Sequence, residues 1–248
     1  MPGIYVMTVL TLAAAGSFAV GLLRAIGRRP VPLWLLALPL PLSAIVNQLV
    51  KRPIFLALAA AAGVDAVVPT SPLWFVLAVW LLPPITEEGI KLVTLVLPFV
   101  RRELRDGESA LLVGAAVGLG FGLGEAAYVG YALGLRSDLA GLPWYAFFPF
   151  LGERVAAVFI HGALTSIVAV GLWRGGRSAI GAYLAAVALR AAANTGPMLA
   201  QLGIVSSDIA SLFLIPVALL IAAIFERQRR ATRPASAVRV AQIYTRRG

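Results

Sequence analysis

The sequence predicts an all-α protein, a polytopic bundle of about seven to eight transmembrane helices. Of its 248 residues, 60% are hydrophobic and only 13% are charged, which makes it far more apolar than a typical soluble domain. Apolar stretches of about 20 residues recur along the chain, and each can cross a hydrocarbon core about 30 Å thick as a helix. The stretches are continuous rather than alternating with a period of two, so helices are favoured over a β-barrel.

The apolar stretches define seven expected spans. The expected spans cover residues 4–23, 31–50, 73–100, 109–134, 147–173, 178–198 and 208–225. A further apolar stretch over residues 53–68 follows Lys51 and Arg52, which would lie outside the membrane in this scheme. That stretch either lies along the membrane interface or makes an eighth span.

Basic residues gather between the spans and explain the net charge of +10. The arginines concerned are Arg24, Arg28, Arg29, Arg101, Arg102, Arg105, Arg174, Arg177 and those from Arg227 to Arg233. Under the positive-inside rule these segments are cytoplasmic. The sequence therefore predicts one membrane domain over residues 1–225 and a basic cytoplasmic tail over 226–248. The expected partner is the lipid bilayer and the expected location is a prokaryotic cell membrane, and no nucleic-acid partner is expected.

The fourth span is unusually rich in glycine. Its glycines are Gly114, Gly118, Gly120, Gly122, Gly124, Gly130 and Gly134. Small residues at such spacings let membrane helices approach closely. The pattern predicts close helix packing, either within one protomer or between protomers.

The third span carries a glutamate pair and a lysine midway along a long apolar stretch. An ionisable side chain at the centre of a membrane helix costs about 2.5 to 3.5 kcal/mol on insertion scales, so it usually faces a partner or a cavity. Lys91 follows Glu87 by four residues and Glu88 by three, so it can neutralise one carboxylate and leave the other as a general acid or base. Pro83 and Pro84 precede the acids and are expected to break the helix there.

The next spans add a lone glutamate, the only histidine and an amide. Glu125 has no basic residue within a helical turn, so its partner is expected on another span, where Arg154 is the candidate. His161 follows Arg154 by seven residues and lies on roughly the same helix face. Asn194, four residues after Arg190, can donate a hydrogen bond to an oxyanion. Because the spans alternate in direction, three helices are expected to bring the acids and the histidine to one site.

Three short motifs follow in order along consecutive spans. Residues 87–91 read EExxK, Phe121 begins an FxxxE motif that ends at Glu125, and His161 follows alone. This order and spacing resembles the PrsW family of intramembrane proteases, distant relatives of the CAAX prenyl endopeptidases. The stretch that leads to the histidine is also similar to the YhfC-type membrane glutamic proteases. The likeness covers roughly residues 70–200, the expected catalytic core.

The resemblance implies an enzyme that hydrolyses peptide bonds of membrane-anchored protein substrates. It implies catalytic roles for Glu87, Glu88, Glu125 and His161, supported by Lys91, Phe121, Arg154 and Asn194. In the favoured glutamic version, a glutamate activates water while His161 and Asn194 polarise the scissile carbonyl or stabilise its oxyanion, and no cofactor is needed.

Related enzymes are also described as metalloproteases, and the residues permit that version. Glu88, Glu125 and His161 would then hold a divalent ion such as zinc. A single histidine and the absence of an HExxH helix make a zinc site atypical. The CAAX enzymes have a histidine where this chain has Glu125, which argues against a prenylated substrate. The chain has no cysteine, so disulfides, thiolate metal sites and cysteine nucleophiles are excluded.

Two other classes of protein remain open. Buried glutamates, a histidine and proline-broken helices also form ion pathways, so a proton- or cation-coupled transporter is the alternative. The sequence has no internal repeat of the inverted kind that many transporters contain, which argues against that alternative. In a non-catalytic scaffold or receptor, the buried charges would form structural ion pairs.

Overall fold

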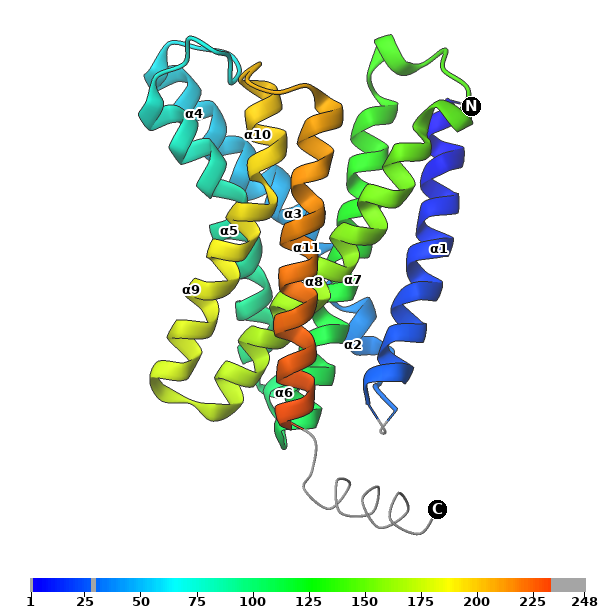
Figure 1. The fold of residues 1–248 in the computed structure, drawn as a ribbon, viewed down its shortest axis with the longest axis vertical. Helices are drawn as coiled ribbons and strands as arrows, with labels where there is room; N and C mark the ends of the chain where they lie inside the picture. Colours follow the sequence, from blue (N-terminus) through cyan, green and yellow to red (C-terminus); the bar gives the residue numbers. More distant parts are fainter. Residues whose placement is uncertain (1, 28–29, 233–248) are drawn as a thin grey trace.

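Helices make up all the regular structure in residues 2–27 and 30–232, the part of the chain that this computed structural model describes (Figure 1). The helices are α1 (Gly3–Ile26), α2 (Trp34–Ala37), α3 (Leu42–Ile45), the π-helix η1 (Val46–Lys51), α4 (Arg52–Ala62), α5 (Leu73–Val96), α6 (Pro98–Arg101), α7 (Gly107–Gly134), the 3-10 helices η2 (Ser137–Leu139) and η3 (Trp144–Phe147), α8 (Phe148–Arg174), α9 (Gly176–Ala193), α10 (Thr195–Gln201) and α11 (Ser207–Thr232). The predicted all-α class is confirmed.

Six helical stretches among the described residues are long and apolar enough to cross a membrane. They are Gly3–Ile26, Trp34–Ala62, Leu73–Val96, Gly107–Gly134, Trp144–Arg174 and Ser207–Thr232. The expected span over 178–198 is not among them, because α9 is short and carries several polar residues. Together, α9 and α10 nevertheless run along the bundle beside α11 (Figure 1). The polytopic helical bundle is therefore confirmed, with this pair as a further segment along its long axis.

The second stretch differs most from the sequence-based expectation. It begins as α2, turns through Pro39 and Pro41, and continues through η1 into α4, so that residues 34–62 form one broken segment. The apolar residues after position 52 extend this segment and do not form an additional span. Lys51 therefore lies within the segment, where its amino group reaches another helix.

Two further boundaries differ from the expectation. The third span was expected to break at Pro83 and Pro84, yet α5 continues through both prolines. Each proline removes one helical hydrogen bond, a loss that membrane helices tolerate when neighbouring groups compensate. At the other end of the chain, residues 226–232 of the expected tail continue α11. Residues 28, 29 and 233–248, which carry several of the expected cytoplasmic arginines, lie outside the described part of the chain.

Helix α7 is the central helix of the bundle, and all of its residues from 110 to 126 are buried. Gly118 lies against the backbone of His161 and Gly162 in α8, and Gly124 lies against the backbone of Leu40. The predicted close packing by glycine is therefore confirmed within one protomer. Because α7 and α8 meet at His161, this packing also fixes the position of the histidine.

Gly118→Ala is expected to destabilise the bundle. A Cβ atom at this position would overlap the carbonyl of His161, so α7 and α8 would have to separate. Overpacking of this kind costs about 1–3 kcal/mol. The thermal midpoint in detergent should fall relative to Gly16→Ala in α1, where a Cβ atom meets nothing within 4 Å. Equal midpoints for the two variants would contradict this account of the α7–α8 contact.

Candidate active site

The glutamate pair of α5 divides between two different partners. Glu88 accepts a hydrogen bond from Lys91 on the same helix, with 2.6 Å between Oε1 and Nζ. Its other oxygen, Oε2, is buried and has no hydrogen-bond partner within the described residues. Glu87 is turned to another side of the helix. The expectation that the lysine neutralises one carboxylate is therefore met, and that carboxylate is Glu88.

Glu87 is held by two cations from other parts of the chain. Lys51 donates to Oε1 over 2.8 Å, and Arg190 donates to Oε2 through both Nε at 3.2 Å and Nη2 at 3.0 Å. The carboxylate and the guanidinium are both buried. Lys51 thus belongs to the buried network, whereas the sequence pattern placed it outside the membrane. The signal that was available is that mostly apolar residues continue directly on both sides of Lys51 and Arg52, over 42–50 and 53–62.

Glu125 of α7 is the residue that joins the network together. Arg190 Nη2 lies 3.3 Å from Oε1, while Arg154 Nη1 and His161 Nε2 lie 3.3 Å and 3.1 Å from Oε2. The expected pairing of Glu125 with Arg154 is confirmed. Arg190, which the sequence showed only as the neighbour of an amide, lies between Glu87 and Glu125 and bonds to both.

His161 is completely buried and uses both of its ring nitrogens. Lys91 Nζ lies 3.0 Å from Nδ1, and Glu125 Oε2 lies 3.1 Å from Nε2. An ammonium group can only donate, so Nδ1 accepts from Lys91, and Nε2 carries the hydrogen and donates to Glu125. Phe121 packs on this pair, with its ring centroid 5.0 Å from that of His161 and 5.3 Å from Lys91 Nζ.

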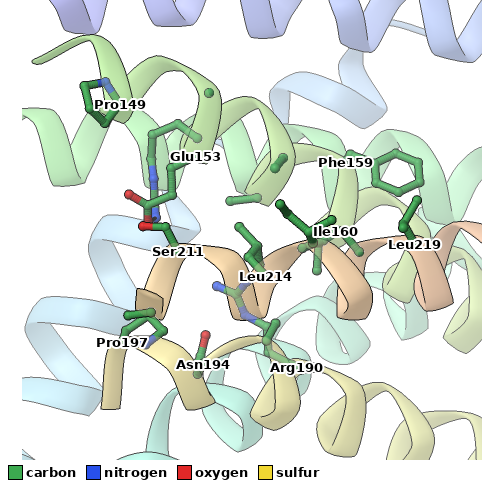
Figure 2. A pocket seen from close by; sticks show the side chains of 18 of the residues that line it. Pro149, Glu153, Phe159, Ile160, Arg190, Asn194, Pro197, Ser211, Leu214 and Leu219 are labelled. Atoms are coloured by element: carbon green, nitrogen blue, oxygen red, sulfur yellow. Dashed lines mark hydrogen bonds and ion pairs between the residues drawn. The ribbon is translucent and has the colours of Figure 1, made fainter. Parts of the chain in front are cut away.

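A cavity of about 840 Å³ lies beside this network, between α8, α9, α10 and α11. Figure 2 shows Arg190 and Asn194 on one wall and Leu214 of α11 on another. Arg154 also lines the cavity, so both arginines that contact Glu125 are reached from it. The structure gives the Asn194 side chain no hydrogen bond within residues 2–27 and 30–232, so its amide is free to donate to a ligand.

The network brings together the site residues that the sequence suggested, and it adds two cations. The expected convergence of α5, α7 and α8 is found, and α9 and η1 contribute as well. Six of these site residues are linked by direct contacts, namely Glu88, Lys91, His161, Phe121, Glu125 and Arg154. Glu87 joins this group through Arg190. Asn194 stands apart from the acids, on the cavity wall.

One group of side chains in the described part of the chain has the geometry to hold a metal ion. Single ligand atoms of Glu87, Glu125 and His161 lie within 4.8 Å of one another. The sequence-based set contained Glu88 instead, but that carboxylate is bound to Lys91. Three protein ligands are also the number found in catalytic zinc sites.

In this structure the three residues are engaged by cations of the chain itself. Arg190 Nη2 bonds to both carboxylates and so lies between them. Lys91 Nζ contacts Nδ1 of His161, and Glu125 contacts Nε2. Lys51 and Arg154 add two further positive charges beside the carboxylates. The donor set is therefore closed by ion pairs here, and a divalent ion would have to displace Arg190 from the carboxylates.

Comparison with known proteins gives one clear match. A family model described as PrsW family intramembrane metalloprotease matches residues 31–224. This range covers most of the chain and contains every residue of the buried network. No curated protein and no solved structure matches the chain.

Proposed function

The chain belongs to the PrsW family of intramembrane proteases, and on this basis we propose that it is an endopeptidase in which a glutamate-activated water hydrolyses peptide bonds of membrane-anchored proteins. One observation carries the proposal. Three glutamates, the only histidine and two arginines meet inside an apolar bundle, and the arginines line a cavity large enough for a peptide segment. Membrane proteins bury such groups at high cost, and they usually do so for function.

Glu125 is the general base in this proposal. Glu88 is bound to Lys91 away from the cavity, and Glu87 is held from two sides by Lys51 and Arg190. Glu125 is the most exposed of the three, with 10% of its side chain accessible against 2% and 1% for the others. It also lies against both arginines that line the cavity. A water molecule that enters from the cavity therefore reaches Glu125 first.

Arg190 and Asn194 stabilise the oxyanion. Both residues line the cavity, they stand one helical turn apart on α9, and both offer N–H donors. Glu125 takes a proton from water as the oxygen bonds to the scissile carbon, and it returns that proton to the leaving nitrogen as the C–N bond breaks. His161 acts through Glu125, because its Nε2–H donates to the carboxylate and keeps it oriented. Glu87 holds Arg190 in place from the other side.

Catalysis in this proposal depends on no metal ion, because Arg190 already neutralises both Glu87 and Glu125. The experiment that tests the function uses purified protein in detergent and a model single-span substrate. Cleavage is expected with and without a strong chelator, and metal analysis of the active sample should find no stoichiometric ion. Loss of cleavage on chelation, with recovery on adding zinc, would show that the glutamic mechanism is wrong.

A transporter that uses the same glutamates remains the competing function. The family match and the closed ion pairs both count against an ion pathway. Ion flux into liposomes that Glu125→Gln abolishes, without any detectable proteolysis, would favour it. The same liposome sample assayed with a model substrate separates the two functions.

The proposed orientation places the lower end of the bundle in Figure 1 in the cytoplasm. The ends of α1, α8 and α11 that carry Arg24, Arg174 and Arg227 lie at this end, together with Arg101 of α6. Basic residues near span ends mark the cytoplasmic side. The N-terminus then lies on the opposite side of the membrane.

Lys51→Met is expected to lower kcat while the protein stays folded. The substitution removes one of the two cations on Glu87, so Arg190 is held less firmly against the oxyanion position. A hydrogen bond to a charged group contributes about 1.5–3 kcal/mol, which corresponds to a loss of roughly 10- to 100-fold in rate. Arg52→Met is the matched control, because Arg52 is exposed and its hydrogen bond in the described part of the chain goes to Gln48, outside the network. Equal activity of the two variants would show that Lys51 does not contribute to catalysis.

A further inference from the structure

The cavity beside the network carries a positive charge that the buried acids do not balance. The largely buried charged groups are the carboxylates Glu87, Glu88 and Glu125 and the cations Lys51, Lys91, Arg154 and Arg190. With His161 neutral, three negative charges face four positive ones. One cation therefore lacks a buried counter-charge within the described residues.

The excess charge falls on Arg154. Lys91 is paired with Glu88, and Arg190 bonds to both Glu87 and Glu125. Arg154 reaches Glu125 through Nη1, which lies 3.3 Å from Oε2. His161 Nε2 lies closer to the same oxygen, at 3.1 Å. Nε of Arg154 is buried and finds no hydrogen-bond partner in the part of the chain that the structure describes. An arginine that is 85% buried in an apolar bundle is thus incompletely paired.

Glu153 supplies the missing charge from the rim of the cavity. Its carboxylate pairs with Arg154 Nη2, although 52% of the Glu153 side chain is exposed. In Figure 2, Glu153 extends from α8 toward Ser211 of α11 at one end of the cavity. Because the side chain is half exposed, its carboxylate can leave Arg154 and enter water at low cost. A second carboxylate can therefore replace Glu153 as the partner of Arg154.

From this charge balance we infer that the cavity binds an apolar substrate segment carrying one acidic side chain, which displaces Glu153 and pairs with Arg154. The inference rests on the proposed protease function and adds the class of its substrate. The cavity walls supply the apolar contacts, through residues such as Phe159, Ile160, Leu214 and Leu219. Arg154 supplies the one charge, and its planar guanidinium suits a carboxylate.

The position of the acidic residue follows from the distance between Arg154 and the base. Arg154 contacts Glu125 directly, and an extended chain advances about 3.3 Å per residue. The acidic side chain therefore lies within about two residues of the scissile bond. An acidic residue farther along the substrate would lie beyond the reach of Arg154.

The test compares matched substrates that differ only in charge. A model single-span substrate carries Asp or Asn at each of the three positions on either side of its cleavage site, and kcat/KM is measured with the full-length protein in nanodiscs of neutral lipid. At one position near the scissile bond, Asp should be preferred over Asn by about tenfold, as expected for a charge-assisted pair. The preference should appear in KM, since Arg154 is a specificity residue.

Two variants test whether Arg154 causes the preference for Asp over Asn. Glu153→Gln removes the competing carboxylate and should increase the Asp to Asn ratio measured within that sample. Arg154→Gln should bring the ratio to about one, whatever activity remains. The ratio is read within one protein sample, so a general loss of activity in either variant does not affect it.

The outcomes separate this inference from the proposed function. A sample that cleaves no substrate contradicts the protease function itself. Cleavage of Asp and Asn substrates at equal rates, by the wild type and by Glu153→Gln, overturns the inference and leaves the protease function intact. Inhibition of both substrates by added anionic lipid, with a ratio of one, would mean that a lipid phosphate pairs with Arg154, and the inference would again be wrong.

Discussion

Glu125→Gln is expected to lower kcat by about 10²–10⁴-fold, the range typical of a lost general base, while the bundle stays folded. The amide keeps the size of the side chain but cannot take the proton from water. Folding should survive because the cations that Glu125 contacts have other partners: Arg190 has Glu87, and Arg154 has Glu153. The measurement is single-turnover cleavage of a model single-span substrate, together with the thermal midpoint in detergent.

The matched control for this variant is Glu103→Gln, which neutralises a glutamate that pairs with Arg105 and lies outside the cavity. Its effect on cleavage should be small. If Glu125→Gln retains activity within about tenfold of the wild type, a different group is the base. Glu88 would then be the next candidate, because its buried Oε2 has no hydrogen-bond partner among the described residues.

Arg190→Met is expected to be the most destabilising single change in the network. Among the residues that the structure describes, Arg190 alone bonds to both Glu87 and Glu125, and it is buried in apolar surroundings. Removing one member of a buried ion pair costs about 3–5 kcal/mol, because an uncompensated charge is left behind. Such a loss is a large fraction of the stability of a typical domain. The readout is the thermal midpoint and the yield of monodisperse protein in detergent.

A second substitution distinguishes this electrostatic cause from a loss of packing. Glu87→Gln in the Arg190→Met background removes the carboxylate that has lost its main partner, so it should recover part of the stability. Arg177→Met, on the exposed side of the same helix, is the control and should have no measurable effect. If the double variant is no more stable than Arg190→Met alone, the cost comes from packing and the ion-pair account is wrong.

The local sequence was sufficient to identify most of the buried polar residues. Glu87, Glu88, Glu125 and His161 stand out because each interrupts an apolar stretch, and charge inside lipid is costly enough to be noticed without a structure. The pairing of Lys91 with Glu88 follows from helix spacing alone, since residues three apart share a helix face. The glycines of α7 likewise predict close packing, which the structure places against α8 and Leu40.

The contacts between segments that are distant in the chain could not be predicted from the local sequence. Lys51 was expected outside the membrane, because the sequence divides residues 34–62 into a span and a separate apolar stretch. In the structure the helix continues through η1, and this continuity brings Lys51 to Glu87. Helix α5 was expected to break at its two prolines, and it does not. In both cases neighbouring helices decide whether an irregular segment stays helical, and local propensity does not contain that information.

The sequence by itself therefore determined that this protein is a helical membrane bundle with buried acids and one histidine, because hydrophobicity and helix periodicity are local properties of the chain. Only the tertiary structure decided which cation pairs with which acid. Arg190 lies 65 residues from Glu125 and 103 from Glu87, and it bonds to both. The metal question also depends on these pairings, because they determine whether His161 has a free lone pair. Ion pairs form across space between packed helices, so their choice follows from the arrangement of the helices.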